Sequence, residues 1–238
     1  MVDNLTILTH SHTDCTDLWL PYFDSYENHF KGQDHIVLLN ESKDFDFGLP
    51  VIEYNEFNEK HSDRMLKGLK NIKSKYVIIT MEDMFLYDDV FVNELVDVLN
   101  FMSENDAFCV RLIKSGISSN TNTPNGKIHS MTNNDFLFSI TPTVWDKDKL
   151  IELLSDYKSL NVWEMELQIS KSLNLSDFKS YYYYNGENKR GRNHFDSSIY
   201  PHICSAIYKG KWNTKEYLNE LMPIFKKYGI DYEKRGVV

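Results

Sequence analysis

A short, continuously apolar run at residues 75–80 limits the possible folds of this chain more than any other feature. Its sequence, KYVIIT, is rich in β-branched and aromatic residues and shows no alternation of apolar with polar positions. Strands of this kind are typical of sheets that helices cover on both faces. Such sheets are mostly parallel, because the covering helices connect strands that run in the same direction. The run therefore predicts an α/β fold.

The first half of the chain alternates strands and helices at the spacing that a doubly wound sheet requires. Apolar, β-rich runs predict strands at residues 5–9, 35–39, 50–54 and 75–80. Amphipathic stretches, the last of them with acids at its amino end, predict helices at residues 17–30, 60–73 and 88–104. We therefore predict a Rossmann-like α/β fold, with a mostly parallel central sheet flanked by helices.

The second half of the sequence is less regular. Strands are predicted at residues 107–113, 136–140 and 181–184, with a further extended stretch at 199–208. Helices are predicted near residues 147–156, 162–172 and 214–228. No internal repeat and no low-complexity linker marks a boundary, so we expect residues 1–238 to form a single domain.

The charge balance argues against some classes of partner. The chain has 26 Lys and Arg residues and 35 Asp and Glu residues, which gives a formal net charge of −9. A chain this acidic is not expected to bind nucleic acid or an anionic membrane surface non-specifically. It can still bind a nucleotide, because a metal ion and a few local cations neutralise a diphosphate.

The hydrophobic and cysteine patterns predict a cytoplasmic protein. No apolar run approaches the roughly 20 residues of a membrane span, and the sequence does not open with a basic segment followed by an apolar one. Its 3 cysteines, Cys15, Cys109 and Cys204, are widely spaced and odd in number. This usage argues against a disulfide framework. We therefore expect a reducing compartment and no integral membrane segment.

Two adjacent acids, Glu82 and Asp83, follow the buried run. In open α/β sheets, ligands bind beyond the carboxyl ends of the strands. Carboxylates at such a place are costly unless they are solvated, paired or bound to a metal. Mg²⁺ or Mn²⁺ takes one or two protein carboxylates and completes its shell with substrate phosphates. The alternative is that both acids belong to the amino end of the next helix.

The order of elements and the segment YVIITMED at residues 76–83 resemble the GT-A family of nucleotide-sugar glycosyltransferases. The resemblance extends over roughly residues 4–170. It implies a nucleotide-sugar-binding half at residues 1–105. It also implies an acceptor half with a C-terminal closing segment at residues 106–238.

The resemblance also assigns the acidic pair. The metal-binding motif of the family is written DxD, and its last acid corresponds to Asp83, which would bind Mn²⁺ or Mg²⁺. Glu82 lies beside it and would contact the nucleotide-sugar. Met81 replaces the first Asp, so the sequence departs from the full motif.

Two polar segments are implied to contact the nucleotide-sugar donor. The loop after the first strand lies where GT-A enzymes hold the base and ribose. Its candidate residues are Thr9, His10 and Asp14. In the polar helix that follows the third strand, Asp63 would accept from a ribose or sugar hydroxyl, and Arg64 would pair with a phosphate. The alternatives are an ordinary polar turn and a helix capped by Ser62.

A late acidic segment supplies the candidate general base. Inverting GT-A enzymes use one Asp or Glu to take the proton from the acceptor hydroxyl. Glu166 is the preferred residue here, and Glu164 is the alternate. Trp145 and Trp163 would contact the acceptor sugar, because an aromatic face packs against sugar C–H bonds. The alternative is that Trp163 anchors the core and both acids belong to a helix amino terminus.

The basic stretch at residues 188–194 is the expected C-terminal closing segment. In an acidic protein, its Arg190 and Arg192 are candidates to receive the diphosphate. His194, with His202 as second choice, is implied as a further metal ligand by the resemblance. The alternative is a solvated basic loop.

Together these features predict an inverting, metal-dependent glycosyltransferase. It would move a sugar from a nucleotide-diphosphate donor, in the first instance a UDP-sugar, to a hydroxyl of a glycan or similar acceptor. One alternative is a non-catalytic carbohydrate- or nucleotide-binding protein on the same fold. Another is a nucleotidyltransferase, although the loop after the first strand has no glycine and no Lys or Arg. The absence of GxGxxG after any strand excludes a Rossmann dehydrogenase.

Overall fold

In the described part of the chain, eight strands form the central sheet, in the order β3-β2-β1-β4-β7-β5-β8-β6. A computed structural model describes residues 1–42, 45–115, 126–133, 136–191 and 194–238. The strands are β1 Leu5–His10, β2 His35–Leu39, β3 Val51–Glu53, β4 Tyr76–Met81, β5 Cys109–Arg111, β6 Ile128–Ser130, β7 Thr143–Asp146 and β8 Ser180–Tyr183.

The sheet is mixed but mostly parallel. β3, β2, β1 and β4 pair in parallel with one another. β7 runs antiparallel to both of its neighbours, β4 and β5. β8 is parallel to β5, whereas the edge strand β6 is antiparallel to β8. The predicted fold class is therefore confirmed, with β6 and β7 as the reversed strands.

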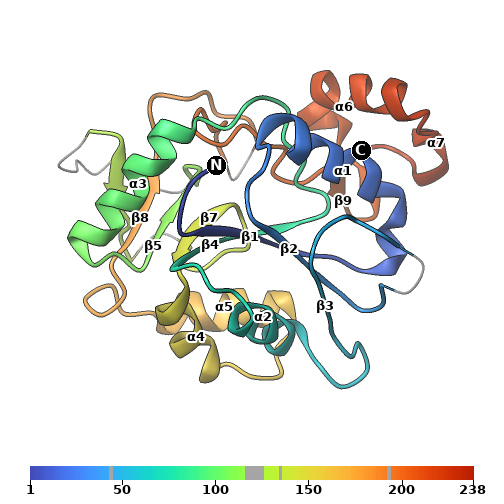
Figure 1. Cartoon of the computed structure of the whole chain (residues 1–238). Coiled ribbons are helices and arrows are strands. Elements are labelled where there is room, and N and C mark those ends of the chain that lie inside the picture. The colour runs from blue at the N-terminus through green and yellow to red at the C-terminus, as the bar shows by residue number, and fades with distance from the viewer. Residues whose placement is uncertain (43–44, 116–125, 134–135, 192–193) are drawn as a thin grey trace.

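Helices cover both faces of the sheet, as the apolar run in β4 predicts (Figure 1). Residues of α2, α4 and α5 build one core with the sheet, and residues of α1, α3 and α6 build the other. None of the described helices is long and apolar enough to cross a membrane. The helix bounds are α1 Thr16–His29, α2 His61–Lys70, α3 Val92–Asn105, α4 Lys147–Ser155, α5 Val162–Ser172, α6 Thr214–Tyr228 and α7 Tyr232–Arg235.

Strand β4 links the two cores. Val77 and Ile79 pack into the core with α2, α4 and α5, whereas Ile78 packs into the core with α1, α3 and α6. Pairing with β1 aligns Met81 with His10, so both strands end at the same edge of the sheet. The buried strand therefore sets the position of the acids that follow it.

The strand predicted at residues 136–140 is wrong. Phe138 and Ile140 are buried, as their apolar character suggests, but their amides donate to side chains of α5 and not to a neighbouring strand. Phe138 N donates to Ser170 Oγ at 3.0 Å, and Ile140 N donates to Glu166 Oε1 at 2.6 Å. The strand that pairs with β4 and β5 is instead β7, a few residues later.

The carboxyl-terminal region also differs from the prediction. The extended stretch predicted at residues 199–208 contains only the short strand β9, Ile207–Tyr208, which pairs with β10, Lys211–Trp212. Strand β10 and helix α7 are absent from the sequence-based assignment. By contrast, α6 begins and ends where its apolar spacing predicts.

Trp145 is a core residue and not an acceptor contact. Its side chain is 1% exposed, and its ring lies 5.2 Å from that of Phe108 and 5.1 Å from that of Phe138. A sugar cannot reach a ring enclosed in this way, so the sequence-based assignment is corrected. β7 is covered on both faces: Val144 packs into the core with α1, α3 and α6, and Trp145 packs into the core with α2, α4 and α5.

We expect Trp145→Ala to lower the free energy of unfolding by about 3–5 kcal/mol, because the substitution leaves a large cavity between packed rings. Urea denaturation measures this change. Trp163→Ala is the matched control, since Trp163 is 76% exposed and its loss should change stability by less than about 0.5 kcal/mol. Equal effects of the two substitutions would contradict the assignment of Trp145 to the core.

Candidate active site

A cleft of about 390 Å³ lies at the carboxyl end of β4. Glu82 and Asp83 line it from the turn after β4, and Trp163 and Glu166 line it from α5. Residues of the C-terminal segment complete the wall. Those residues are Cys204, Ser205, Ile207 and Arg235. The cleft therefore brings together acids that are separated by more than 80 positions in the sequence.

Asp83 is held by the C-terminal segment. Ser205 Oγ donates to Asp83 Oδ2 at 2.9 Å, and Ile207 N approaches the same oxygen at 3.4 Å. The backbone is fixed as well, because Ala206 N donates to Asp83 O at 2.9 Å. Burial raises the pKa of Asp83, and these hydrogen bonds partly oppose the shift. The carboxylate is therefore oriented by residues far along the chain.

Glu82 is more buried than its neighbour and is incompletely satisfied. The residue is 7% exposed, and its Oε2 has no hydrogen-bond partner among the described residues. Burial, followed by repulsion from Asp83, raises the pKa of Glu82 to about 7. A buried carboxylate oxygen with no partner is costly and suggests a missing ligand.

Glu82 and Asp83 suit a hard divalent cation, to which the protein would supply only part of the coordination shell. Oxygen donors suit Mg²⁺ or Mn²⁺, and a bound cation would offset the cost of two adjacent buried acids. The described residues contain no group of three or more His, Cys, Asp or Glu side chains at metal-binding spacing. Such a cation would therefore take Glu82 and Asp83 and complete its shell with water or with substrate phosphates.

Glu166, from α5, lines the same cleft as these acids. The amide of Ile140 donates to Glu166 Oε1 at 2.6 Å, which fixes the carboxylate. Burial raises the pKa of Glu166, while this amide and Ser139 oppose the shift. A partly buried carboxylate of this kind is a stronger proton acceptor than an exposed one.

The other residues of the acidic segment have different roles. Glu164 belongs to the capping box of α5: its amide donates to Asn161 Oδ1 at 3.0 Å, and its carboxylate accepts from Asn161 N at 2.9 Å. Glu164 does not line the cleft, so the helix-terminus alternative describes it correctly. Trp163 lines the cleft with its side chain exposed and is free to contact a ligand.

Thr9 is a core residue and cannot contact a ligand. It is 0% exposed. Its Oγ1 lies 2.6 Å from Tyr22 Oη, 2.6 Å from His35 Nε2 and 3.1 Å from Thr80 Oγ1. This network ties α1 to β1, β2 and β4 beneath the sheet edge. The sequence-based assignment of Thr9 to donor binding is therefore corrected.

The polar residues after β1 separate into two environments. His10 is 7% exposed; its ring stacks on Tyr54 at 5.3 Å and meets His61 edge-on at 4.7 Å. Burial lowers the pKa of both imidazoles, and neither His10 nitrogen has a hydrogen-bond partner among the described residues. Asp14, in contrast, has a side chain that is 89% exposed.

The polar helix at Asp63 and Arg64 is capped, as the alternative interpretation expects. Asp63 accepts from Lys60 N at 3.1 Å in the capping box of α2 and from Ser159 N at 3.1 Å. Arg64 donates to the carbonyls of Glu59 and Glu56 at 2.7 and 3.1 Å. The cap residue is Lys60 and not the predicted Ser62. Neither Asp63 nor Arg64 lines the cleft at the end of β4, so neither is placed to contact a donor there.

The basic stretch connects two parts of the C-terminal region. Arg190 donates to Asp196 Oδ1 and to Glu220 Oε1, each at 2.7 Å, so its charge is neutralised within the protein. Arg190 also does not line the cleft, so its assignment to the diphosphate is corrected. Arg192, the other candidate, lies outside the described residues.

His194 is near the cleft but does not line it. Its Nε2 lies 2.7 Å from Tyr217 Oη, which accepts from Cys204 N at 3.1 Å. The imidazole therefore supports the cleft wall from behind. His202, the second choice, is 5% exposed, and its Nδ1 lies 2.7 Å from Tyr200 O. Neither ring reaches Asp83 as a metal ligand would.

Sequence reasoning missed the part of the site that follows residue 200. Ser205, Ile207 and Arg235 contact Asp83 or line its cleft, yet none belongs to a recognisable motif. The spacing of these residues carries no signal, because tertiary packing alone brings them to β4.

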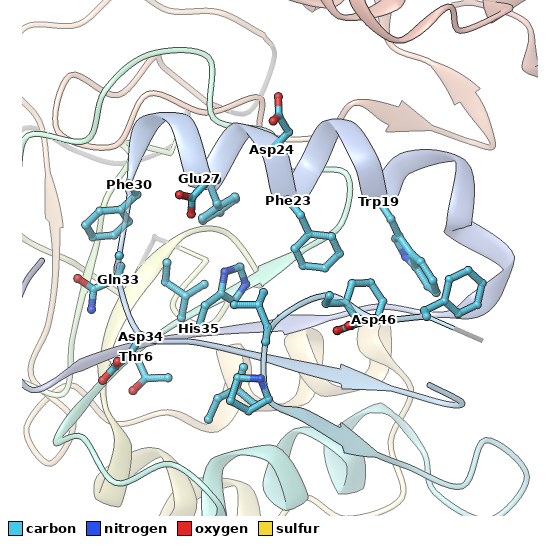
Figure 2. Close-up of a pocket in the computed structure, with 18 of the residues that line it drawn as sticks. Thr6, Trp19, Phe23, Asp24, Glu27, Phe30, Gln33, Asp34, His35 and Asp46 are labelled. Carbon is cyan, nitrogen blue, oxygen red and sulfur yellow. The ribbon is translucent and has the colours of Figure 1, made fainter. Parts of the chain in front are cut away.

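A larger cavity, of about 1130 Å³, lies elsewhere. It opens between α1 and β2, where Trp19 and Phe23 extend from the helix and Phe23 lies beside His35 (Figure 2). None of the candidate site residues lines it.

Comparisons with known proteins identify the fold. No protein-family profile matches the chain, and no curated protein matches it by sequence. A cytidylyltransferase from Leptospira borgpetersenii serovar Hardjo-bovis is similar in structure, with a TM-score of 0.50 and 14% sequence identity over 95% of each chain. Residues 1–349 of S. aureus TarS in complex with UDP are also similar, with a TM-score of 0.51 and 11% identity. That match covers 98% of this chain and 67% of TarS 1–349.

At these identities the likeness establishes the fold alone. The chain is an α/β domain of the GT-A and nucleotidyltransferase-like type, a fold used by transferases that bind nucleotides. The candidate cleft lies beyond the carboxyl end of a central strand, where ligands bind in sheets of this kind.

We expect Arg190→Gln to lower the free energy of unfolding by about 1–3 kcal/mol, because it leaves two carboxylates without their partner. Chemical denaturation measures the loss. Lys189→Gln is the matched control, since this exposed neighbour removes the same charge and should change stability by less than about 0.5 kcal/mol. An unchanged Arg190→Gln stability would show that the arginine is not structural.

Proposed function

We propose that this protein is a metal-dependent glycosyltransferase that uses a nucleotide-sugar donor. The observation that carries the proposal is that Glu166 lines the same cleft as Glu82 and Asp83. Glycosyl transfer needs a site for the diphosphate and a base for the acceptor. The lining of this cleft offers residues for both requirements.

Glu166 is the proposed general base. It takes the proton from an acceptor hydroxyl as that oxygen attacks the anomeric carbon, and the nucleoside diphosphate leaves from the opposite face. Burial raises the pKa of Glu166, which makes it a stronger proton acceptor than an exposed carboxylate. Glu164 is occupied by the helix cap. The exposed face of Trp163 would pack against the acceptor sugar. The transfer therefore inverts the anomeric configuration.

Glu82 and Asp83 form the proposed donor end. They would hold Mn²⁺ or Mg²⁺, whose charge stabilises the departing diphosphate. The donor in this proposal is a UDP-sugar. His10, the last residue of β1, and Asp14, in the turn that follows, remain the proposed contacts to base and ribose.

A second candidate function is nucleotidyl transfer. Of the two reactions, the structural comparisons favour this one more, because the cytidylyltransferase matches 95% of both chains. Such a reaction joins a nucleoside monophosphate to an acceptor and releases pyrophosphate. Two features of the site weigh against it. The loop after β1 has no glycine, Lys or Arg to hold a triphosphate, and the cleft contains a carboxylate base that the reaction does not require.

Product analysis distinguishes these functions. We expect the protein to release UDP from a UDP-sugar in the presence of Mn²⁺ and a carbohydrate acceptor, with an inverted linkage in the product. Pyrophosphate release from CTP or UTP would instead establish nucleotidyl transfer. Binding of a nucleotide-sugar without turnover in an acceptor panel would favour the non-catalytic alternative.

We expect Glu166→Gln to lower the rate of transfer by about 10²–10⁴-fold and to leave nucleotide affinity unchanged, because the amide cannot accept the proton. Steady-state kinetics and calorimetric titration with UDP measure the two effects. Glu164→Gln is the control: it preserves the capping box and should retain the rate of the unmodified protein. Full transfer by Glu166→Gln would remove this residue from the mechanism.

A further inference from the structure

The charged side chains that line the candidate cleft are acidic, with one exception. Its described lining includes three carboxylates, from Glu82, Asp83 and Glu166, and a single basic side chain, that of Arg235. A diphosphate that enters such a cleft needs cationic partners beyond one metal ion, because its own charges add to those of the acids. Arg235 is the described residue placed to supply that charge.

Backbone hydrogen bonds of the last residues fix the position of Arg235 in the lining of the cleft. Arg235 ends the short helix α7, and backbone hydrogen bonds anchor the residues that follow. Trp212 N donates to Gly236 O at 2.9 Å, and Val238 N donates to Trp212 O at 3.0 Å. The arginine therefore extends from a fixed backbone, and its position does not depend on a free terminus.

The guanidinium is only partly occupied. Asp17, in the first turn of α1, accepts from Arg235 Nη2 at 2.5 and 2.7 Å and from Nε at 3.1 Å. Nη1 makes no hydrogen bond to any described residue, so its donors are available. The Asp17 side chain is 51% exposed, so solvent and salt screen this pair. The pair orients the guanidinium without occupying all of its donors.

We propose that Arg235 binds the diphosphate of the nucleotide substrate. The planar guanidinium can donate two hydrogen bonds to phosphate oxygens while its charge neutralises the group that leaves. This inference rests on the proposed function but holds for either candidate reaction, since UDP and pyrophosphate are both diphosphates. It assigns to the chain terminus the role that the sequence suggested for Arg190 and Arg192.

Calorimetric titration of Arg235→Gln with UDP and with CTP, each in the presence of Mn²⁺, tests this inference. We expect an affinity loss of about 10- to 100-fold for whichever nucleotide the unmodified protein binds. Arg235→Lys should lose less affinity than Arg235→Gln, because lysine keeps the charge but cannot donate two parallel hydrogen bonds as the planar guanidinium does. Lys234→Gln, on the same helix and exposed, is the matched control and should bind as the unmodified protein does.

The outcomes separate this inference from the proposed function. Equal affinities of Arg235→Gln and the unmodified protein would overturn the role of Arg235 and leave the proposed function intact. Equal losses in Arg235→Gln and Lys234→Gln would also overturn it, since a general charge effect would then explain the change. If the unmodified protein binds neither nucleotide, the proposed function fails and this inference fails with it. Thermal unfolding of each variant shows that it is folded.

Discussion

The burial of two adjacent carboxylates at the end of β4 is the constraint on which the rest of the site depends. β4 is central and packs into both cores, so Glu82 emerges buried and Asp83 half-buried. Burial raises the pKa of both groups. A fold accepts that cost where a ligand offsets it. A divalent cation with a phosphate-bearing substrate is the ligand that two carboxylates and an open coordination shell fit best.

The second half of the chain supplies the other residues of the candidate site, beside the two acids that follow β4. Ser205 and Ile207 fix one oxygen of Asp83, α5 adds Glu166 to the lining of the cleft, and α7 adds Arg235. These contributions come from three separate segments, and each is held by backbone hydrogen bonds or caps that do not involve the ligand. Preorganisation of this kind keeps the charged groups in place before a substrate arrives.

Local sequence patterns predicted much of the fold but less of the site. The apolar run in β4 and the four-residue spacing in α1 and α6 fixed the sheet type and most helix positions, because burial dictates those patterns. The strand predicted at residues 136–140 was wrong, because side chains of α5, and not a neighbouring strand, accept hydrogen bonds from the amides of Phe138 and Ile140. The candidate role of Glu82 and Asp83 could be predicted, because they follow a buried strand and ligands bind beyond the carboxyl ends of such strands. The partners Ser205 and Arg235 could not be predicted, because only tertiary packing brings them to the cleft.

The most direct test of this account is the calorimetric affinity for UDP with and without Mn²⁺, compared between the unmodified protein and Asp83→Asn. The account predicts that Mn²⁺ strengthens UDP binding at least about tenfold in the unmodified protein, because the cation joins the carboxylates to the diphosphate. It predicts that Asp83→Asn loses this enhancement. An affinity that is independent of Mn²⁺, or an enhancement that survives in Asp83→Asn, would contradict the central role of the acidic pair.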